Sequence, residues 1–412
     1  MEENIEAIKK TLKKYSQEHL LDEYEKLDET KQKQLLDQIQ HIDFELINSL
    51  YNNTRKEIDV QDSKISPIEY LDKDKLNGYY KGFQETGEKA IRAGKLAAVT
   101  MAGGQGTRLG HNGPKGTFDI GLDSHKSLFE LLSDSLKTQG KKYDVTIPWF
   151  IMTSEENNDQ TIEFFAKHRF FGYEKDKNIF FFKQGELPMV DTEGKILIGE
   201  NGLIKEAADG HGGIYEALVK NGMTKKMREL GVEWIFIGGV DNCLVKMVDP
   251  VLMGIAIQKH VTAAGKSVVK SNPGEKVGVF CKKNGRPSVV EYTEIPKEMA
   301  EAKDERGELI YESHILCNLF NIDAVERMGT KPLPYHSAFK KATYIDKNGN
   351  KVVPDGPNAY KFEAFLFDAF GELDDMAILR VKREEEFAPV KNASGVDSPE
   401  TARELYRKFY QL

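Results

Sequence analysis

Short apolar runs and longer amphipathic stretches alternate through the middle of the chain, from about residue 91 to residue 385. The apolar runs have the length and the β-branched and aromatic content of buried strands, and the stretches between them have helical spacing. The predicted strands cover 96–101, 149–153, 179–182, 234–237, 277–281, 288–292, 315–320 and 376–381, and the predicted helices cover 127–138, 161–168 and 214–221. This alternation predicts an α/β fold with a mostly parallel sheet covered by helices on both faces.

The pattern differs on either side of this central region and at one place inside it. Residues 1–90 read as helical, because apolar side chains such as Ile5 and Ile8 recur at spacings of three and four. The closely spaced runs between 277 and 320 have no helix between them, so we expect an antiparallel addition at one edge of the sheet. Residues 386–412 form a short C-terminal segment, in which Ser398-Pro399-Glu400 predicts the start of a helix.

A glycine-rich turn follows the first predicted strand and carries the strongest chemical signal. It reads Gly103-Gly104-Gln105-Gly106 and is followed by Arg108, Gly110 and Pro114-Lys115. Glycine lets backbone N–H groups approach an anion and adopt positive φ without a Cβ penalty. Arginine offers a planar fork for phosphate oxygens and lysine a movable point charge. The combination predicts a nucleoside triphosphate site at the carboxyl end of a strand, where open α/β sheets bind ligands.

Two better-known glycine motifs do not fit this turn. The dinucleotide motif G-x-G-x-x-G would need glycine at 109 after Gly104 and Gly106, but Leu109 stands there. The nearest match to a P-loop, Gly265-Lys266-Ser267, has His260 where the leading glycine belongs. A purely structural turn from strand to helix is the remaining alternative, and the Arg and Lys that follow the glycines argue against it.

Composition narrows the class of protein. Hydrophobic residues make up 40% and charged residues 30% of the 412, as in ordinary folded proteins, and the net charge of −8 with no long basic run argues against a nucleic-acid partner. Cys243, Cys281 and Cys317 are widely spaced, so we expect buried thiols in a reducing compartment. The charged N-terminus and the absence of a long apolar run predict neither a signal peptide nor a membrane span, and hence a cytoplasmic location.

With the glycine loop, six further blocks make the chain resemble the UDP-sugar pyrophosphorylases, and among them the eukaryotic-type UDP-N-acetylglucosamine pyrophosphorylases. The blocks cover 124–129, 183–188, 209–215, 240–242, 290–295 and 391–393, in the order of the family. The resemblance implies a Rossmann-like, GT-A-like nucleotidyltransferase domain at 91–385, between the helical region 1–90 and the segment 386–412. It also implies a reaction in which UTP and a sugar 1-phosphate give a UDP-sugar and pyrophosphate.

The resemblance implies a role for each matching residue. The nucleotide is expected to meet Met101, Ala102, Gly103, Gly104 and Gly210, with Gln184 reading the uracil edge. The expected catalytic residues are Arg108, Lys115 and Lys391, the expected Mg²⁺ ligand is Asp241, and the expected sugar contacts are Glu291 and Tyr292. Four of these residues also have a structural interpretation without a role in the reaction. Gln184 would then be a polar strand end, Asp241 a turn residue, Glu291 a solvent-facing strand residue and Lys391 a solvated lysine. Asp368 matches a family aspartate, but a place on a helix surface explains it equally well.

Three departures from the family pattern leave the sugar open. His211, expected beside the nucleotide, stands where the N-acetylglucosamine enzymes have Asn, and Gly239 replaces a common cysteine. His314, expected at the sugar pocket, replaces the Asn of an Asn-Ile pair. The resemblance implies that both histidines contact the substrate. N-acetylglucosamine or N-acetylgalactosamine 1-phosphate is the expected substrate, and glucose 1-phosphate is the alternative. A non-catalytic UDP-sugar-binding protein is the alternative of a different class, although such a protein would be expected to lack Arg108, Lys115 or Asp241. The oligomeric state stays open.

Overall fold

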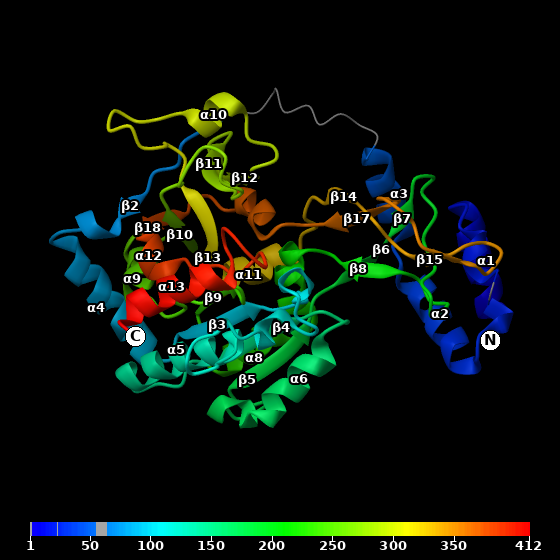
Figure 1. The fold of residues 1–412 in the computed structure, drawn as a ribbon, viewed down its shortest axis with the longest axis horizontal. Helices are drawn as coiled ribbons and strands as arrows, with labels where there is room; N and C mark the ends of the chain where they lie inside the picture. Colours follow the sequence, from blue (N-terminus) through cyan, green and yellow to red (C-terminus); the bar gives the residue numbers. More distant parts are fainter. Residues whose placement is uncertain (1, 23, 55–63) are drawn as a thin grey trace. The chain divides into compact units, whose positions relative to one another are not determined.

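The computed structural model describes residues 2–22, 24–54 and 64–412, and the chain divides into two compact units, each described here by itself (Figure 1). The small unit comprises Met1–Asp62, Gly185–Gly213 and Leu333–Phe365, and the sheet unit comprises Ser63–Gln184, Ile214–Pro332 and Leu366–Leu412. Both units draw on segments far apart in the sequence, whereas the predicted parts 1–90, 91–385 and 386–412 are each continuous.

The sheet unit is built on a sheet whose main path runs β2-β18-β10-β13-β9-β3-β4-β5. These strands are β2 (Leu71–Asp72), β3 (Leu96–Met101), β4 (Trp149–Thr153), β5 (Ile179–Lys183), β9 (Trp234–Gly239), β10 (Ala263–Val268), β13 (Ser313–Asn321) and β18 (Ala377–Arg380). Neighbours on this path are parallel, except that β13 is antiparallel to both β9 and β10. The mostly parallel α/β sheet expected from the sequence is confirmed.

Three features of this sheet correct the sequence prediction. β13 lies in its interior, between β9 and β10, and not at an edge. Only β11 (Val279–Lys283) and β12 (Arg286–Val290) form a side branch, which also pairs with β1 (Ile65–Ser66). The strands β1 and β2 lie within the region expected to be wholly helical, and β10 was not expected at all, because its sequence Ala-Ala-Gly-Lys-Ser-Val contains residues that strands disfavour.

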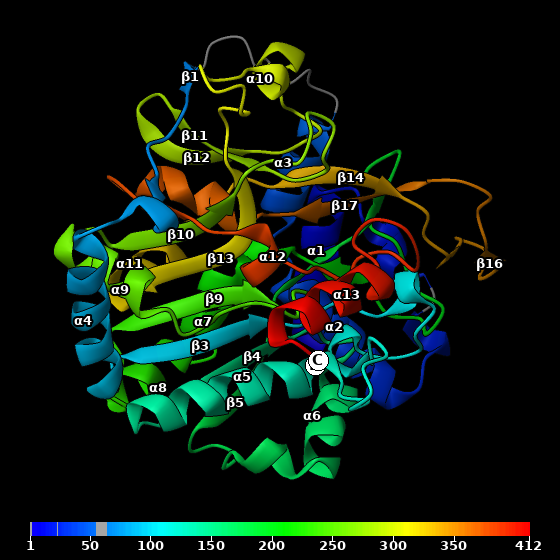
Figure 2. The ribbon, with the colours of Figure 1, turned by 60° about the vertical axis from the view of Figure 1, so that its left-hand side comes forward.

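The register of the sheet brings the carboxyl ends of its central strands together. All six residues of β3 are buried. Its last residue, Met101, pairs with Met152 of β4 on one side and with Gly239 of β9 on the other. The loops that leave β3, β4 and β9 therefore begin at the same edge of the sheet, as Figure 2 shows for β3 and β9.

Helices cover both faces of this sheet. Alternate residues of β3 join an apolar core with α4 (Tyr79–Arg92), α5 (Leu128–Tyr143) and α9 (Pro250–Gln258). α4 and α9 approach so closely that a Cβ on Gly87 would lie 1.9 Å from the carbonyl oxygen of Pro250. On the other face, Tyr215 of α7 (Ile214–Lys220) packs edge-on against Phe320. The remaining helices of the unit are α6 (Asn158–Lys167), α8 (Met223–Glu229), α10 (Lys297–Glu301), α11 (Ile322–Gly329), α12 (Arg383–Glu386) and α13 (Pro399–Tyr410).

Capping side chains fix where several of these helices begin. Ser127 opens α5 with a capping box that includes Glu130, and Ser398 opens α13 in the same way with Thr401, as predicted for that position. Elsewhere the structure confirms that the three cysteines are buried. Of the helices that the structure describes, none combines the length and the apolar character needed to cross a membrane.

The small unit packs helices from the start of the chain with strands from two later segments. Its helices are α1 (Glu2–Lys14), α2 (Glu29–His41) and α3 (Phe44–Asn53), which confirm the helical spacing for this part of 1–90. Its strands are β6 (Glu186–Pro188), β7 (Val190–Asp191), β8 (Glu206–Ala208), β14 (His336–Lys340), β15 (Tyr344–Ile345), β16 (Lys351–Val352) and β17 (Ala359–Glu363), all paired antiparallel. Leu12 and Leu35 share its core with Val190 and Phe362.

Candidate active site

The glycine loop begins where β3 ends, and its own backbone folds it into a compact turn. The N–H of Gly106 donates to the carbonyl of Gly113 at 2.9 Å, and the N–H of Lys115 donates to the carbonyl of Gly104 at 3.0 Å. The N–H groups of Gly103 and Gly104 donate to no group in the described part of the chain. These two donors are therefore available to phosphate oxygens at the carboxyl end of the strand.

Asn157 holds this loop from the neighbouring strand connection. Its buried amide nitrogen lies 2.8 Å from the carbonyl oxygen of Ala102 and 3.3 Å from that of Gly104. Both acceptors belong to the loop, so the side chain fixes the backbone around Gly103 and Gly104. No motif or spacing in the sequence pointed to Asn157.

At Gly103 the structure gives a steric reason for glycine and not one of backbone angles. Positive φ occurs at Gly110 (69°) and Gly113 (151°), whereas Gly103 and Gly104 do not have it, contrary to the simplest reason for glycine there. A Cβ on Gly103 would lie 2.5 Å from Oε1 of Gln184. The side chain of Gln184 therefore rests against the loop, next to the backbone positions predicted to hold the nucleotide.

Asp241 follows β9 and pairs with Lys115. The Lys115 Nζ lies 3.4 Å from the Asp241 Oδ2, and the two side chains are 18% and 25% exposed. Burial raises the pKa of Asp241, but the charges of Lys115 and Lys391 outweigh this effect, so the pKa lies below its ordinary value. A Cβ on Gly239 would lie 2.8 Å from the Asp241 Oδ1, so the glycine that departs from the family pattern leaves room for this carboxylate.

The segment after α12 is bound along the Asp241 turn, and it carries Lys391. The N–H of Val390 donates to the carbonyl of Asp241 at 2.9 Å, and the N–H of Ala388 donates to Oδ1 of Asn242 at 2.9 Å. The Lys391 Nζ lies 3.6 Å from Oδ2 of Asp397. This chain path explains how the charge of a distant lysine reaches Asp241.

Arg108 lies in a one-turn 3₁₀ helix of the loop, Thr107–Leu109, and is exposed. Its guanidinium takes part in no ion pair or hydrogen bond with the described residues. A surface arginine without a protein partner on a loop of free N–H donors is suited to a phosphate, and its predicted role stays a prediction.

The predicted sugar contacts lie on the antiparallel part of the sheet. Glu291 and Tyr292 follow β12, where Oε1 of Glu291 would lie 3.1 Å from a Cβ on Gly278 and Tyr292 is 43% exposed. His314, on β13, is only 7% exposed, and its ring meets Phe280 edge-on at 4.9 Å between centroids. His314 is thus a core residue in this structure, and its contact with the sugar stays a prediction.

Gly210 and His211 lie in the small unit. Their block is rich in glycine because it packs closely against the backbone of Ala364. Gly210 has a φ of 88°, and a Cβ on it would lie 2.3 Å from the carbonyl oxygen of Ala364. The N–H of Gly212 donates to that same oxygen at 2.8 Å. The ring of His211 lies 5.5 Å from that of Phe365. The predicted roles of Gly210 and His211 toward the nucleotide stay predictions.

The carboxylate of Asp241 is suited to bind Mg²⁺ together with the phosphates of a nucleotide. Magnesium takes oxygen ligands, keeps several waters and is commonly bound by one or two carboxylates together with substrate phosphates. Within residues 2–22, 24–54 and 64–412, no group of three or more His, Cys, Asp or Glu is arranged to hold a metal. An ionised and partly exposed Asp241 suits such shared binding.

Asp368, the other aspartate that matches the family, lies in the 3₁₀ segment Leu366–Glu372. Burial raises the pKa of Tyr215, and the charge of Asp368 raises it further.

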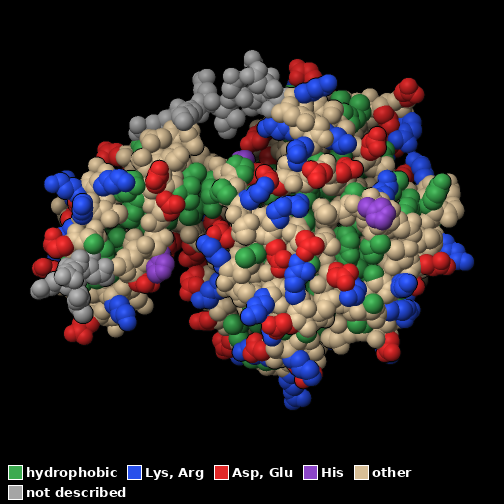
Figure 3. Space-filling model, turned by 180° about the vertical axis from the view of Figure 1, so that it is seen from behind, with side chains coloured by type: hydrophobic (Ala, Val, Ile, Leu, Met, Phe, Trp, Pro, Cys, Tyr) green, Lys and Arg blue, Asp and Glu red, His purple; other side chains and the backbone are tan. Residues whose placement is uncertain are grey.

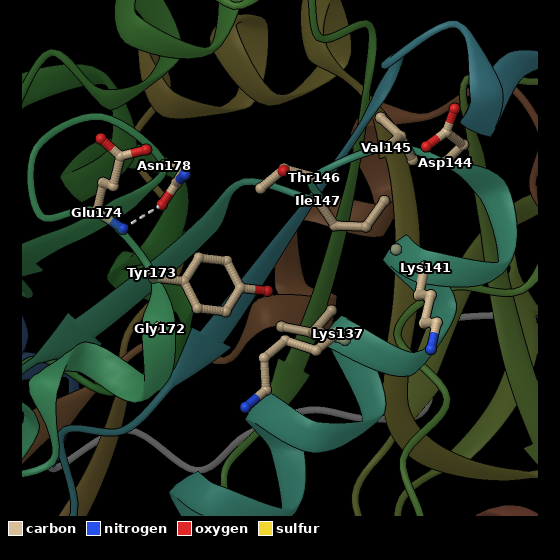
Figure 4. A pocket seen from close by; sticks show the side chains of 12 residues that line it. Lys137, Lys141, Asp144, Val145, Thr146, Ile147, Gly172, Tyr173, Glu174 and Asn178 are labelled. Atoms are coloured by element: carbon tan, nitrogen blue, oxygen red, sulfur yellow. Dashed lines mark hydrogen bonds between the residues drawn. The ribbon is translucent and has the colours of Figure 1, made fainter.

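A separate pocket of about 490 Å³ lies at the amino end of β4 (Figure 4). Lys137, Lys141, Asp144, Tyr173, Glu174 and Asn178 are among its lining residues. None of the predicted site residues lines it. Ligands of open α/β sheets bind at the carboxyl ends of the strands, so the glycine loop remains the candidate site.

Comparison with known proteins agrees with this geometry. A family model described as UTP–glucose-1-phosphate uridylyltransferase matches residues 41–397. A Saccharomyces cerevisiae UDP-N-acetylglucosamine pyrophosphorylase is 37% identical over 418 residues, which cover 97% of this chain and 86% of that protein. Human UDP-N-acetylhexosamine pyrophosphorylase-like protein 1 is 40% identical over 334 residues, and the chain spans 66% of its length.

Solved structures show the same relationship. The chain resembles the UDP-N-acetylglucosamine pyrophosphorylase of Trypanosoma brucei with a TM-score of 0.83 and 31% identity, over 98% of this chain and 84% of that one. A UDP-glucose phosphorylase from the same organism, at 19% identity and a TM-score of 0.62, shares the fold.

Proposed function

Because this chain belongs to the UTP–glucose-1-phosphate uridylyltransferase family, we propose that it transfers the uridylyl group of UTP to a sugar 1-phosphate and releases pyrophosphate. The observation that carries this proposal is the arrangement at one edge of the sheet. Free N–H groups at Gly103 and Gly104 lie on the loop that also presents Lys115 to the carboxylate of Asp241. Such a site can bind and neutralise a triphosphate.

The reaction is an in-line displacement, and its needs match what these residues offer. An oxygen of the sugar phosphate forms a bond to the α-phosphorus of UTP, and the bond from that phosphorus to the bridging oxygen breaks, with pyrophosphate leaving with the electron pair. Such chemistry depends on positioning and on neutralising phosphate charge. In this proposal Arg108, Lys115 and Lys391 supply positive charge, and Gln184 meets the base.

Mg²⁺ is the proposed cofactor, with Asp241 as its protein ligand, and when bound it would neutralise phosphate charge. The proposed partners are UTP and a sugar 1-phosphate, and the proposed location is the cytoplasm. Basic and acidic side chains are interspersed on the face shown in Figure 3, and the net charge is −8. Both observations favour a small anionic substrate held by local charge over a nucleic acid.

We propose N-acetylglucosamine or N-acetylgalactosamine 1-phosphate as the sugar substrate, since relatives at 36–40% identity carry names for N-acetylhexosamine or N-acetylglucosamine enzymes. The test is pyrophosphate release by the purified full chain from UTP, Mg²⁺ and each of four sugar 1-phosphates: the two N-acetylhexosamines, glucose and galactose. The highest kcat/KM is expected for an N-acetylhexosamine. A higher value for glucose would favour the alternative substrate, and no release with any sugar would overturn the proposed reaction.

A further inference from the structure

A cluster of buried charges lies next to the segment that carries Lys391. The side chain of Lys266 is fully buried on β10, and its Nζ lies 2.8 Å from Oδ2 of Asp249 and forms an ion pair with Glu386. The Nζ of Lys73 lies 3.3 Å from Oδ2 of Asp249 and 3.0 Å from Oε1 of Glu386. The Nζ of Lys246 lies 3.5 Å from the same oxygen, and Glu386 is 1% exposed, so three lysines surround a carboxylate that water hardly reaches.

Such a cluster needs a reason beyond stability. Buried ion pairs often contribute no more to stability than apolar residues of the same volume, because both charges lose their hydration. Removing one partner is nevertheless costly, since an uncompensated charge remains. A buried cluster of this kind is therefore suited to fixing one arrangement of the chain.

The chain segment that follows Glu386 runs to the candidate active site. The amide of Asn242 donates to the backbone carbonyl of Glu386 at 2.8 Å, and its Oδ1 accepts from the N–H of Ala388 at 2.9 Å. Two residues later, the N–H of Val390 donates to the carbonyl of Asp241. The segment from Glu386 to Lys391 thus has one end anchored in the charge cluster and runs along the Asp241 turn.

We propose that Glu386, held by Lys266 and Lys73, is a positioning residue that sets Lys391 beside Asp241 for uridylyl transfer. The inference rests on the proposed function, and it concerns a residue that contacts neither substrate. The N–H of Val390 donates to the carbonyl of Asp241 at 2.9 Å, so the next residue, Lys391, lies at this turn, and a loosened segment would lose that placement.

A double-mutant cycle between Glu386→Gln and Lys391→Ala tests this inference. Lys391→Ala is expected to lower kcat by about 10²–10³, as for loss of one charge-stabilising group. Glu386→Gln is expected to lower kcat by about tenfold or more with a smaller change in the KM for UTP. If Glu386 acts through Lys391, the double variant should be no slower than Lys391→Ala, within about twofold.

The control is Glu312→Gln, which removes a buried carboxylate of the same unit. Glu312 is 1% exposed and accepts from Nε of Arg380 at 3.0 Å, without a hydrogen bond to the 386–391 segment. Its effect on kcat, large or small, should multiply with that of Lys391→Ala, whereas its effect on the melting temperature should resemble that of Glu386→Gln. If Glu386→Gln does not fold, Lys73→Met takes its place in the cycle, because Lys73 is a less buried partner of Glu386 than Lys266.

The outcomes separate the inference from the function on which it rests. Multiplicative effects of Glu386→Gln and Lys391→Ala in an active enzyme would overturn the positioning role and leave the proposed function standing. An unchanged kcat in folded Lys391→Ala would also overturn it. Lack of pyrophosphate release by the unaltered enzyme with every sugar 1-phosphate would overturn the proposed function and this inference together.

Discussion

At the residue scale, some residues of the candidate site could be predicted from the sequence, and others could not because their roles depend on distant contacts. The glycines, Arg108, Lys115 and Asp241 stand in a local motif or directly after an apolar strand, so the sequence could point to them. Asn157 could not be found in this way, because its importance comes from two backbone carbonyls more than fifty residues earlier in the chain. For the same reason, the aromatic surroundings of His314 were not predictable.

Arg108→Ala should lower turnover by about 10²–10³, because it removes one of the three cations proposed to neutralise the phosphates. The melting temperature should stay within the error of the measurement, since the side chain is exposed and makes no ion pair among the described residues. Steady-state pyrophosphate release and a thermal melt are the measurements. Arg327→Ala, also at an exposed helix arginine, is the matched control. Near-normal turnover in folded Arg108→Ala would remove Arg108 from the site.

Asp241→Asn should raise the Mg²⁺ concentration needed for half-maximal rate and lower the maximal rate. The amide keeps the shape of the side chain but removes the formal charge that a hard cation prefers. A Mg²⁺ titration of initial rates measures both effects. An unaltered titration would show that Asp241 is structural and would direct attention to Asp368.

Gly103→Ala should raise the KM for UTP more than it lowers kcat. The added methyl group would lie 2.5 Å from Oε1 of Gln184, whose flexible side chain would have to leave its place beside the loop. Gly78→Ala is the control, because a methyl group there meets no atom within 4 Å and its φ is −63°. Equal KM values for UTP in the two variants would argue against a role for Gln184 in binding the base.

At the element scale, strands and helices with a continuous apolar or amphipathic pattern were predictable to within a few residues. β3 and β4 have the predicted bounds, and α13 begins after the predicted cap. β10 was missed because Lys266 interrupts its apolar pattern, and the carboxylates that neutralise this lysine lie at the N-cap of α9 and on α12. A strand whose charge is compensated by distant elements has no local signature.

Ser398→Ala should lower the free energy of unfolding by about 1 kcal/mol, the usual effect of losing an N-cap side chain. Ser398 is buried and accepts from the N–H of Thr401 at 3.3 Å, so the first turn of α13 loses a partner. Urea unfolding followed by circular dichroism measures the change. Ser394→Ala, at an exposed loop serine in the preceding segment, should leave the midpoint unchanged. A midpoint shift of the same size in both variants would contradict the capping role.

At the scale of the whole molecule, the class of fold was predictable and the grouping of the chain was not. Strand–helix alternation is a local pattern, and it led directly to the mostly parallel sheet. The small unit, by contrast, is assembled from three segments, and its core joins Leu12 to Val190 and Phe362. The apolar periodicity of one segment does not predict which distant segment will pack against its apolar face.

The stability of the sheet unit should fall in acid, through the buried carboxyls of Asp249 and Glu386. Burial raises their pKa values, but the charges of Lys266 and Lys73 outweigh this effect and hold both below the ordinary range. A depressed pKa adds stability above the unfolded value, near pH 4, and that stability is lost as the pH falls toward the folded value. Melting temperatures measured from pH 7 to pH 3 should therefore drop, and the gap between the unaltered protein and Glu386→Gln should narrow. A gap that stays constant with pH would contradict the shifted pKa of Glu386.

The place of β18 in the sheet also has a consequence for synthesis. Its Leu379 pairs with Leu71 of β2 on one side, and its Ile378 pairs with Gly265 of β10 on the other. A ribosome makes β2 well before β18, and it must translate the whole stretch from Asp72 to Ala377 before β18 emerges and joins the two strands. Until then β2 and β10 keep open edges that could pair with other chains. The last strand of the sheet thus sets when a nascent chain becomes safe from aggregation.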